Sequence, residues 1–489
     1  MNSSLNPPPK NLPVLAIRGT LWAYLSFIFG KVLTFASTVI LARLLAPEQF
    51  GVVGYCLIAL QYLEILSDFA MDGALVARRD KLEEAANAAF VINLASSLLM
   101  FGAAWVAAPY IAGFFQESAV TDLLRALVLT LPISALAIVP GALLRREMRF
   151  KLKFIPDVSR SLAKGLFSIV LAWQGFGVWS LVWGPVAGET VSALITWLLV
   201  RWRPTFKFDS QVTREMMGIG FHLILVGIMG ALLANVDYLI VGKVLGAAAL
   251  GFYVLAYRIP ELIISNTLRV IGGVALPLVA RSQTDLRSLH RVFFAYLRYI
   301  ALFAFPVSVG LALTAPPFIR IFYTVKWEPA IAVMQSIAVA IGIGSMGFLP
   351  GVIYKAINRP DVLNRFSLIK LPVTIGILWY CTRWGINGVA VGQILVAALN
   401  LTLTLLLAYW VIKIHPYEVL KTALPALGSS LIMGGMIAGG MLLLNPSNVL
   451  VLAFWVASGA AVYVAALTVT SRDTVTQAIT VLRATFSRS

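Results

Sequence analysis

The sequence predicts an all-α polytopic membrane protein with about fourteen transmembrane helices. Three observations predict this class: 60% of the 489 residues are hydrophobic, only 12% are charged, and the mean hydropathy is +0.89. Soluble domains are about 45–50% apolar, and a water-soluble globule of this composition would have too few polar residues to cover its surface. The apolar runs are continuous rather than alternating, which excludes a membrane β-barrel and predicts helices.

Each predicted span is a run of about 20 apolar residues, the length that crosses the hydrocarbon core as a helix. The polar, Pro-rich N-terminus precedes a first apolar run that is too long for the core of a signal peptide, so we expect no cleavable signal. In chain order the spans are 17–41, 51–73, 86–107, 122–144, 155–173, 177–200, 216–242, 251–279, 292–314, 329–352, 363–382, 385–409, 422–444 and 448–470.

The positive charge of the chain is distributed unevenly between the two sets of loops. Lys and Arg exceed Asp and Glu by 38 to 21, giving a formal charge of +17. Alternate loops hold 25 and 5 of the cations, and the rest lie inside spans. Cytoplasmic loops of membrane proteins carry this excess, so both termini are predicted to be cytoplasmic and the number of spans even. The same rule explains the basic charge without a nucleic-acid partner.

An internal repeat divides the spans into two halves. Residues 42–46 are repeated in character at 242–246, and residues 177–184 at 385–392. Each half holds six spans, so both have the same orientation and should be two six-helix lobes related by a pseudo-two-fold axis along the membrane normal. The predicted parts are a disordered cytoplasmic N-terminus, an N-lobe, a C-lobe, two additional helices and a cytoplasmic tail, at 1–16, 17–205, 206–412, 413–470 and 471–489.

Several motifs carry a resemblance to a known family. The segment Leu41-Ala-Arg-Leu-Leu-Ala-Pro-Glu-Gln-Phe-Gly51, with Asn235-Val-Asp237 and Gly251-Phe-Tyr-Val-Leu-Ala-Tyr-Arg258, resembles the polysaccharide-transporter (Wzx-like) branch of the multidrug/oligosaccharidyl-lipid/polysaccharide flippase superfamily. Within that branch it is most similar to the colanic-acid and exopolysaccharide exporters. The resemblance extends over roughly residues 15–410.

The resemblance implies a flippase of the bacterial inner membrane rather than an enzyme. Its substrate would be a lipid-linked oligosaccharide of the undecaprenyl-pyrophosphate type, translocated by alternating access for exopolysaccharide or O-antigen (lipopolysaccharide) assembly. Its partners would be membrane lipids and the polymerase and chain-length regulator of a polysaccharide pathway. No cofactor is expected, and the use of a Na⁺ or H⁺ gradient is left open.

Polar and ionisable residues inside the spans are the candidate substrate-binding residues. Each charge costs about 2.5–3.5 kcal/mol on insertion scales and therefore requires a reason. A pyrophosphate headgroup would supply one, because Arg binds phosphate through its bidentate fork and Lys as a point charge. The candidates are Lys31, Gln61, Glu64, Arg160, Lys164, Arg258, Glu261 and Lys370.

Helical spacing groups four of these candidates into two polar stripes. Gln61 and Glu64 lie on one face of the second span, and Arg258 and Glu261 on one face of the eighth, its repeat mate. The functional interpretation is a polar translocation wall formed by stripes that face each other. The structural alternative is that Arg258 and Glu261 form an ion pair with no contact to substrate.

The remaining candidates are cations at different depths. Lys31 lies about thirteen residues, roughly 20 Å, into the first span, too deep to reach the interface easily. Arg160 and Lys370 are repeat mates near the cytoplasmic third, where snorkelling competes with a role in substrate binding. Lys164 is expected at the depth of Glu189, so a structural ion pair between them is the competing interpretation.

Other chemistry has no support in the sequence. There is no phosphate-binding G-x-x-x-x-G-K-[ST] loop, no cluster of metal ligands and no catalytic nucleophile motif. Two alternatives to the flippase remain. A cation-coupled multidrug exporter of the same superfamily would use a carboxylate in an apolar cavity, whereas the cations inside these spans favour an anionic cargo. A membrane glycan polymerase or ligase would need a sizeable external loop with catalytic residues, and no such loop is predicted.

Overall fold

The computed structural model describes residues 12–68, 73, 75, 78, 80–205, 210–269, 271–272, 279, 286–356, 360–444 and 446–471. Within these ranges the regular structure is entirely helical. This confirms the predicted all-α class, since helices satisfy their own backbone hydrogen bonds in lipid. Of the predicted terminal segments, 1–11 and 472–489 lie outside the described residues. Residues 12–16, which were predicted to be disordered, form the start of helix α1. Two compact units divide the chain, Met1–Gly251 and Phe252–Ser489.

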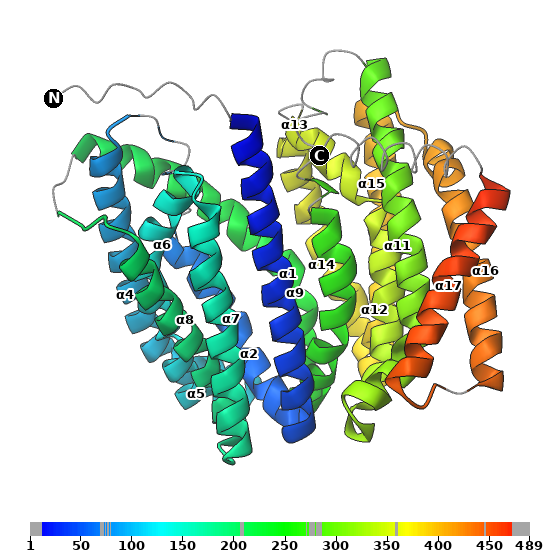
Figure 1. The fold of residues 1–489 in the computed structure, drawn as a ribbon, viewed down its shortest axis with the longest axis horizontal. Helices are drawn as coiled ribbons and strands as arrows, with labels where there is room; N and C mark the ends of the chain where they lie inside the picture. The colour runs from blue at the N-terminus through cyan, green and yellow to red at the C-terminus, as the bar shows by residue number, and fades with distance from the viewer. Residues whose placement is uncertain are drawn as a thin grey trace. The chain divides into compact units, whose positions relative to one another are not determined.

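The first unit contains the helices that build the candidate site (Figure 1). They are α1 (Leu12–Leu44), α2 (Pro47–Asp68), α4 (Leu82–Phe115), α5 (Val120–Leu127), α6 (Thr130–Arg146), α7 (Phe150–Trp173), the 3₁₀ turn η1 (Gly177–Trp179), α8 (Ser180–Leu199) and most of α9 (Ser210–Pro260). Helix α9 is two helices joined at Gly246, whose φ of 86° and ψ of −178° are accessible essentially only to glycine. The break lies between the seventh and eighth predicted spans.

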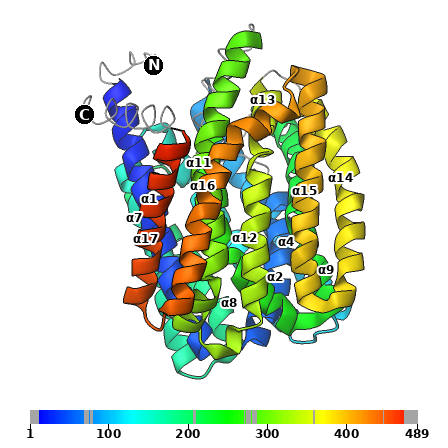
Figure 2. The same ribbon diagram turned by 90° about the vertical axis from the view of Figure 1, so that its right-hand side faces the viewer.

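The second unit begins near the end of α9 (Figure 2). Its elements are the π-helical turn η2 (Glu261–Ser265), α11 (Leu286–Phe322), η3 (Val325–Trp327), α12 (Ala330–Ser345), α13 (Phe348–Ala356), α14 (Pro360–Cys381), η4 (Thr382–Trp384), α15 (Gly385–Ile412), α16 (Pro416–Leu443) and α17 (Val449–Thr470). Leu297, Ile300 and Ala301 of α11 are buried in the main apolar core of this unit.

Each of the fourteen predicted spans overlaps described helix. Ten described helices are long and apolar enough to cross a membrane, and two of these, 227–269 and 368–412, each contain parts of two predicted spans. Of the other spans, α7 is long enough but rich in charge, and α12 is apolar but short. The polytopic membrane architecture is therefore confirmed.

Two spans that were predicted as continuous helices are broken. The fourth is divided into α5 and α6 around Val128, and the tenth into α12 and α13 around Met346. Each break lies four residues before a proline, Pro132 or Pro350. Proline lacks the N–H that would bond the carbonyl four residues earlier, and its ring clashes with that carbonyl, so the helix is interrupted there.

Small residues allow α1, α7 and α8 to pack closely side by side (Figure 1). A Cβ added to Gly30 of α1 would lie 3.1 Å from the Ser161 hydroxyl of α7, and one added to Gly184 of α8 would lie 1.8 Å from the Ser168 hydroxyl. Such contacts are typical of membrane helices, where close packing replaces the hydrophobic effect as a driving force. Helix α7 is therefore held between α1 and α8.

Within the first unit, the start of α2 also packs closely against the second half of α9 where the two helices cross. A Cβ on Gly51 would lie 1.7 Å from the Ala247 carbonyl oxygen, and one on Gly251 would lie 1.9 Å from the Pro47 oxygen. Gly251 lies 200 residues after Gly51, and Ala247 lies 200 residues after Pro47. The two contacts are therefore equivalent under the internal repeat. Beside them, Tyr55 donates a hydrogen bond of 2.9 Å to the Gly242 carbonyl. The paired motifs of the repeat thus form one self-complementary helix crossing.

Candidate substrate-binding pocket

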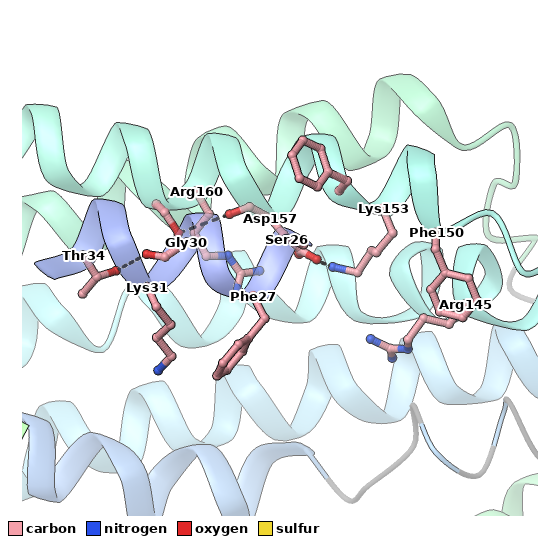
Figure 3. A pocket seen from close by; sticks show the side chains of 12 residues that line it. Ser26, Phe27, Gly30, Lys31, Thr34, Arg145, Phe150, Lys153, Asp157 and Arg160 are labelled. Carbon is pink, nitrogen blue, oxygen red and sulfur yellow. Dashed lines mark hydrogen bonds and ion pairs between the residues drawn. The ribbon is translucent and has the colours of Figure 1, made fainter. Parts of the chain in front are cut away.

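A polar cavity of about 450 Å³ lies between α1 and α7 of the first unit and extends to the end of α6. Helices α1 and α7 run in the same direction here, because Trp22 contacts Phe154 near one end and Gly30 approaches Ser161 further along. The residues that line it are Ser26, Phe27, Gly30, Lys31, Thr34, Arg145, Phe150, Lys153, Phe154, Asp157, Arg160 and Ser161 (Figure 3).

Cations dominate the charge of this pocket. Lys31, Arg145, Lys153 and Arg160 line it together with one carboxylate, Asp157, which gives a formal charge of +3. On α7, Lys153 and Arg160 are seven residues and hence roughly 10 Å apart along the helix axis. Arg145 lies in the last turn of α6. The cations therefore extend from the helix ends into the spans, an arrangement that suits an elongated anionic group.

Two of the pocket cations are held by ion pairs. Lys153 pairs with Asp157 one turn along α7. The Nη2 atom of Arg160 lies 3.2 Å from Oε2 of Glu189 on α8 and 3.3 Å from the Ser192 hydroxyl. The Glu189 side chain is only 21% exposed and that of Arg160 is 41% exposed. Arg160 thus contacts the pocket on one side and a largely buried carboxylate on the other.

Lys31 comes from the middle of α1. Its ammonium lies 5.4 Å from the centre of the Phe27 ring, and both side chains point to the same side of the helix (Figure 3). Hydroxyl groups of Ser26, Thr34 and Ser161 complete the polar lining. The Thr34 hydroxyl donates to the Gly30 carbonyl, and that of Ser161 donates to the Asp157 carbonyl. The pocket therefore offers an anion mainly the charge and N–H donors of its Lys and Arg side chains.

Two of the eight predicted site residues, Lys31 and Arg160, line this pocket. Gln61 and Glu64 on α2 do not line this pocket, but Glu64 is close enough to Arg160 and Lys164 to interact with them electrostatically. Lys164 is half-buried on α7, one turn beyond Arg160, where its backbone approaches Gly188 of α8. These three remain predicted substrate-binding residues that no observation tests.

The three remaining predicted residues belong to the second unit. Arg258 is half-buried on α9. Glu261 pairs with Arg269 at 3.3 Å, a partner that the sequence did not identify. Lys370 donates to the Thr404 hydroxyl at 3.4 Å and lies 4.5 Å from the centre of the Phe366 ring. Their proposed contact with substrate stays a prediction.

Sequence reasoning missed Arg145 and Lys153 as site residues, because it counted them only among the loop cations. A signal for Lys153 was available, since Lys153, Asp157 and Arg160 follow one helical face at spacings of four and three. No pattern within α6 distinguishes Arg145 from Arg146, although Arg146 instead donates to the Leu75 carbonyl at 3.1 Å. No described residues form a cluster of ligands that could hold a metal ion.

Comparison with known proteins gives consistent relatives. A family model described as "Polysaccharide biosynthesis protein" matches residues 40–332, more than half of the chain. The teichuronic acid biosynthesis protein TuaB of Bacillus subtilis is 24% identical over 70% of this chain and 72% of its own length. The succinoglycan biosynthesis transport protein ExoT of Rhizobium meliloti is 26% identical over 73% of each chain. The lipopolysaccharide biosynthesis protein WzxC of Escherichia coli is 24% identical over 85% of this chain and 82% of its own.

Solved structures agree on the fold. The lipid II flippase MurJ in an inward closed conformation superposes with a TM-score of 0.74 at 15% identity, covering 94% of this chain and all of that one. An inward-facing multidrug resistance MATE family transporter gives a TM-score of 0.67 at 16% identity, covering 80% of this chain and 96% of that one. At these identities the likeness shows the fold alone, which is the one that the sequence predicted.

Proposed function

The chain belongs to the polysaccharide biosynthesis protein family, as its resemblance to the Wzx-like branch predicted, and we propose that it is a flippase for a lipid-linked oligosaccharide. The relatives named above take part in polysaccharide biosynthesis or transport rather than in a named catalytic step. We further propose that it has no catalytic activity of its own, and that it works in the bacterial inner membrane with both termini in the cytoplasm.

The observation that carries this proposal is the cationic pocket between α1 and α7. A lipid-linked oligosaccharide of the undecaprenyl-pyrophosphate type presents a diphosphate next to its first sugar. The four cations supply charge and N–H donors for the diphosphate. The volume of about 450 Å³ is in the range of small-molecule sites and suits the headgroup rather than a whole oligosaccharide.

The charge of the pocket also separates this proposal from its rivals. A cationic drug would be repelled by a lining with a formal charge of +3, so the multidrug exporter is the weaker candidate. The segment between α4 and α5, which the proposed orientation places outside the cell, spans only residues 116–119 and offers no room for a catalytic domain of a polymerase or ligase.

In the proposed cycle the headgroup enters the pocket from the cytoplasmic side while the lipid tail stays in the bilayer. The lobes then rock so that the occupied site opens outward. A site with equal affinity in both states would shift no equilibrium, so the headgroup must bind an intermediate closed state more tightly. A pathway polymerase and chain-length regulator would take over the product.

Reconstitution tests the proposal directly. Proteoliposomes carry lipid-linked oligosaccharide in the inner leaflet, and its arrival outside is measured with an impermeant reagent that oxidises the sugars. Lys31→Ala should reduce the rate about tenfold or more, since a hydrogen bond to a charged group contributes about 1.5–3 kcal/mol. Lys151→Ala is the matched control, because Lys151 is exposed on α7 and does not line the pocket. Wild-type protein that moves no oligosaccharide would refute the flippase, and equal rates for the two variants would refute the site.

A further inference from the structure

A second polar cavity lies at one end of the second unit, among α11, α16 and α17. It has a volume of about 200 Å³ and is separate from the proposed substrate pocket. Figure 2 shows these three helices running side by side, with α11 extending beyond the ends of the other two. Its lining includes Arg298 and Leu302 of α11, Lys421, Thr422 and Pro425 of α16, and Ser471 after α17.

The lining of this cavity combines positive charge with hydroxyl groups. Arg298 and Lys421 are the charged residues of its lining, and no carboxylate lines it in the part of the chain that the structure describes. Ser471 contributes a hydroxyl, and the Thr422 hydroxyl donates to the Glu418 carbonyl at 2.8 Å. Basic cavities between membrane helices near the interface bind the headgroups of anionic lipids. The chemistry therefore suits a phosphate diester.

The surroundings of the cavity favour a lipid over a free anion. Leu420 and Leu424 flank the lining residues of α16 and are 61% and 63% exposed, and Val469 of α17 is 82% exposed. These apolar side chains offer contact to acyl chains directly beside the cations. Tyr463 of α17 donates to the carbonyl of Leu302 on α11 at 3.0 Å, and this hydrogen bond ties together two of the helices that form the cavity.

We propose that this cavity binds the phosphodiester of an anionic phospholipid, with its acyl chains against the exposed faces of α16 and α17. Arg298 and Lys421 contact the phosphate. The site gives a binding role to α16 and α17, the two helices that have no counterpart in the internal repeat. It does not depend on which substrate the protein transports.

Thermal unfolding of the purified full chain in detergent tests the site. Phosphatidylglycerol should raise Tm, whereas phosphatidylcholine and inorganic phosphate at the same concentration should not. Lys421→Gln should raise about fivefold the phosphatidylglycerol concentration that is needed for the same increase in Tm. This factor corresponds to the contribution of one cation to the binding of an anionic lipid near a membrane surface. Lys413→Gln is the control, since Lys413 is exposed at the same end of the unit and lies outside the cavity. It should respond like the wild type.

Several outcomes would overturn the proposal. Equal Tm increases with both phospholipids would show no headgroup recognition, and an increase with inorganic phosphate would make this a free-anion site. Equal weakening in Lys413→Gln would assign the effect to general surface charge. If Lys421→Gln does not fold, native mass spectrometry of the wild type from mixed-lipid vesicles decides: preferential retention of phosphatidylglycerol supports the site, and equal retention of both lipids refutes it.

Discussion

The ion pair between Arg160 and Glu189 allows a structural role to be separated from a role in transport. Arg160→Gln removes a cation from the pocket and also leaves Glu189 without that partner inside the membrane. Glu189→Gln in the same chain removes the carboxylate as well. We therefore expect the single Arg160→Gln variant to lose both stability and transport, and the double variant to recover stability alone.

The geometry sets the magnitude. The two charged groups are 3.2 Å apart, and the side chains of Glu189 and Arg160 are 21% and 41% exposed. Breaking a fully buried pair costs about 3–5 kcal/mol, while an exposed pair contributes about 0–1 kcal/mol. For this half-buried pair we expect Arg160→Gln to lower the free energy of unfolding by about 2 kcal/mol. The double variant should lie within about 1 kcal/mol of the wild type, since both members of the ion pair are replaced by neutral amides.

Two measurements on the same preparations test this reasoning. Thermal unfolding in detergent reports stability, and the proteoliposome assay reports transport per folded molecule. The double variant should be as stable as the wild type but at least tenfold slower. A double variant that transports at the wild-type rate would show that Arg160 serves only to neutralise Glu189. A single variant of unchanged stability would show that the pair contributes nothing to the fold.

Three further predictions concern other parts of the chain. Arg258→Ala should abolish transport while the abundance of the protein stays normal. Arg258→Lys should retain only part of the transport rate, because Lys lacks the bidentate fork of Arg. A wild-type rate in Arg258→Lys would show that bidentate binding is not required. Gly51→Ala should lower the free energy of unfolding by about 3 kcal/mol, because its Cβ would overlap a backbone oxygen. Gly113→Ala is the control and should leave the free energy of unfolding unchanged, since no atom lies within 4 Å of the added Cβ. Equal stability of the two variants would contradict the close crossing of α2 and α9. Ser118→Cys should react with an impermeant thiol reagent in intact cells, and protection until the cells are permeabilised would reverse the predicted orientation.

The helices themselves were predictable because their signals are local. A run of about 20 apolar residues must become a helix in lipid, whatever it packs against. The break of α9 at Gly246 agrees with the predicted boundary between two spans. The breaks at Val128 and Met346 were missed, although Pro132 and Pro350 lie four residues after them and could have indicated both.

The candidate site was only partly predictable. A cation deep in a span is conspicuous in sequence, so Lys31 and Arg160 were identified by the cost of placing them there. Arg145 and Lys153 lie near span ends, where the positive-inside rule is a sufficient explanation for any cation. The partners were less predictable still: Glu261 pairs with Arg269, eight residues along the chain, and Glu189 pairs with Arg160.

The sequence by itself determined the membrane class, the spans, the family and the candidate cations, because hydropathy and motifs depend only on residues that are close together in the chain. Only the tertiary structure decided which cations share a pocket. Gly30 lets α1 approach Ser161 of α7, and this close packing places Lys31 beside Arg160, 129 residues away. Spacing along a single helix contains no information about a neighbouring helix. The pocket therefore follows from how small residues let two distant helices meet, and that is a property of the packed molecule.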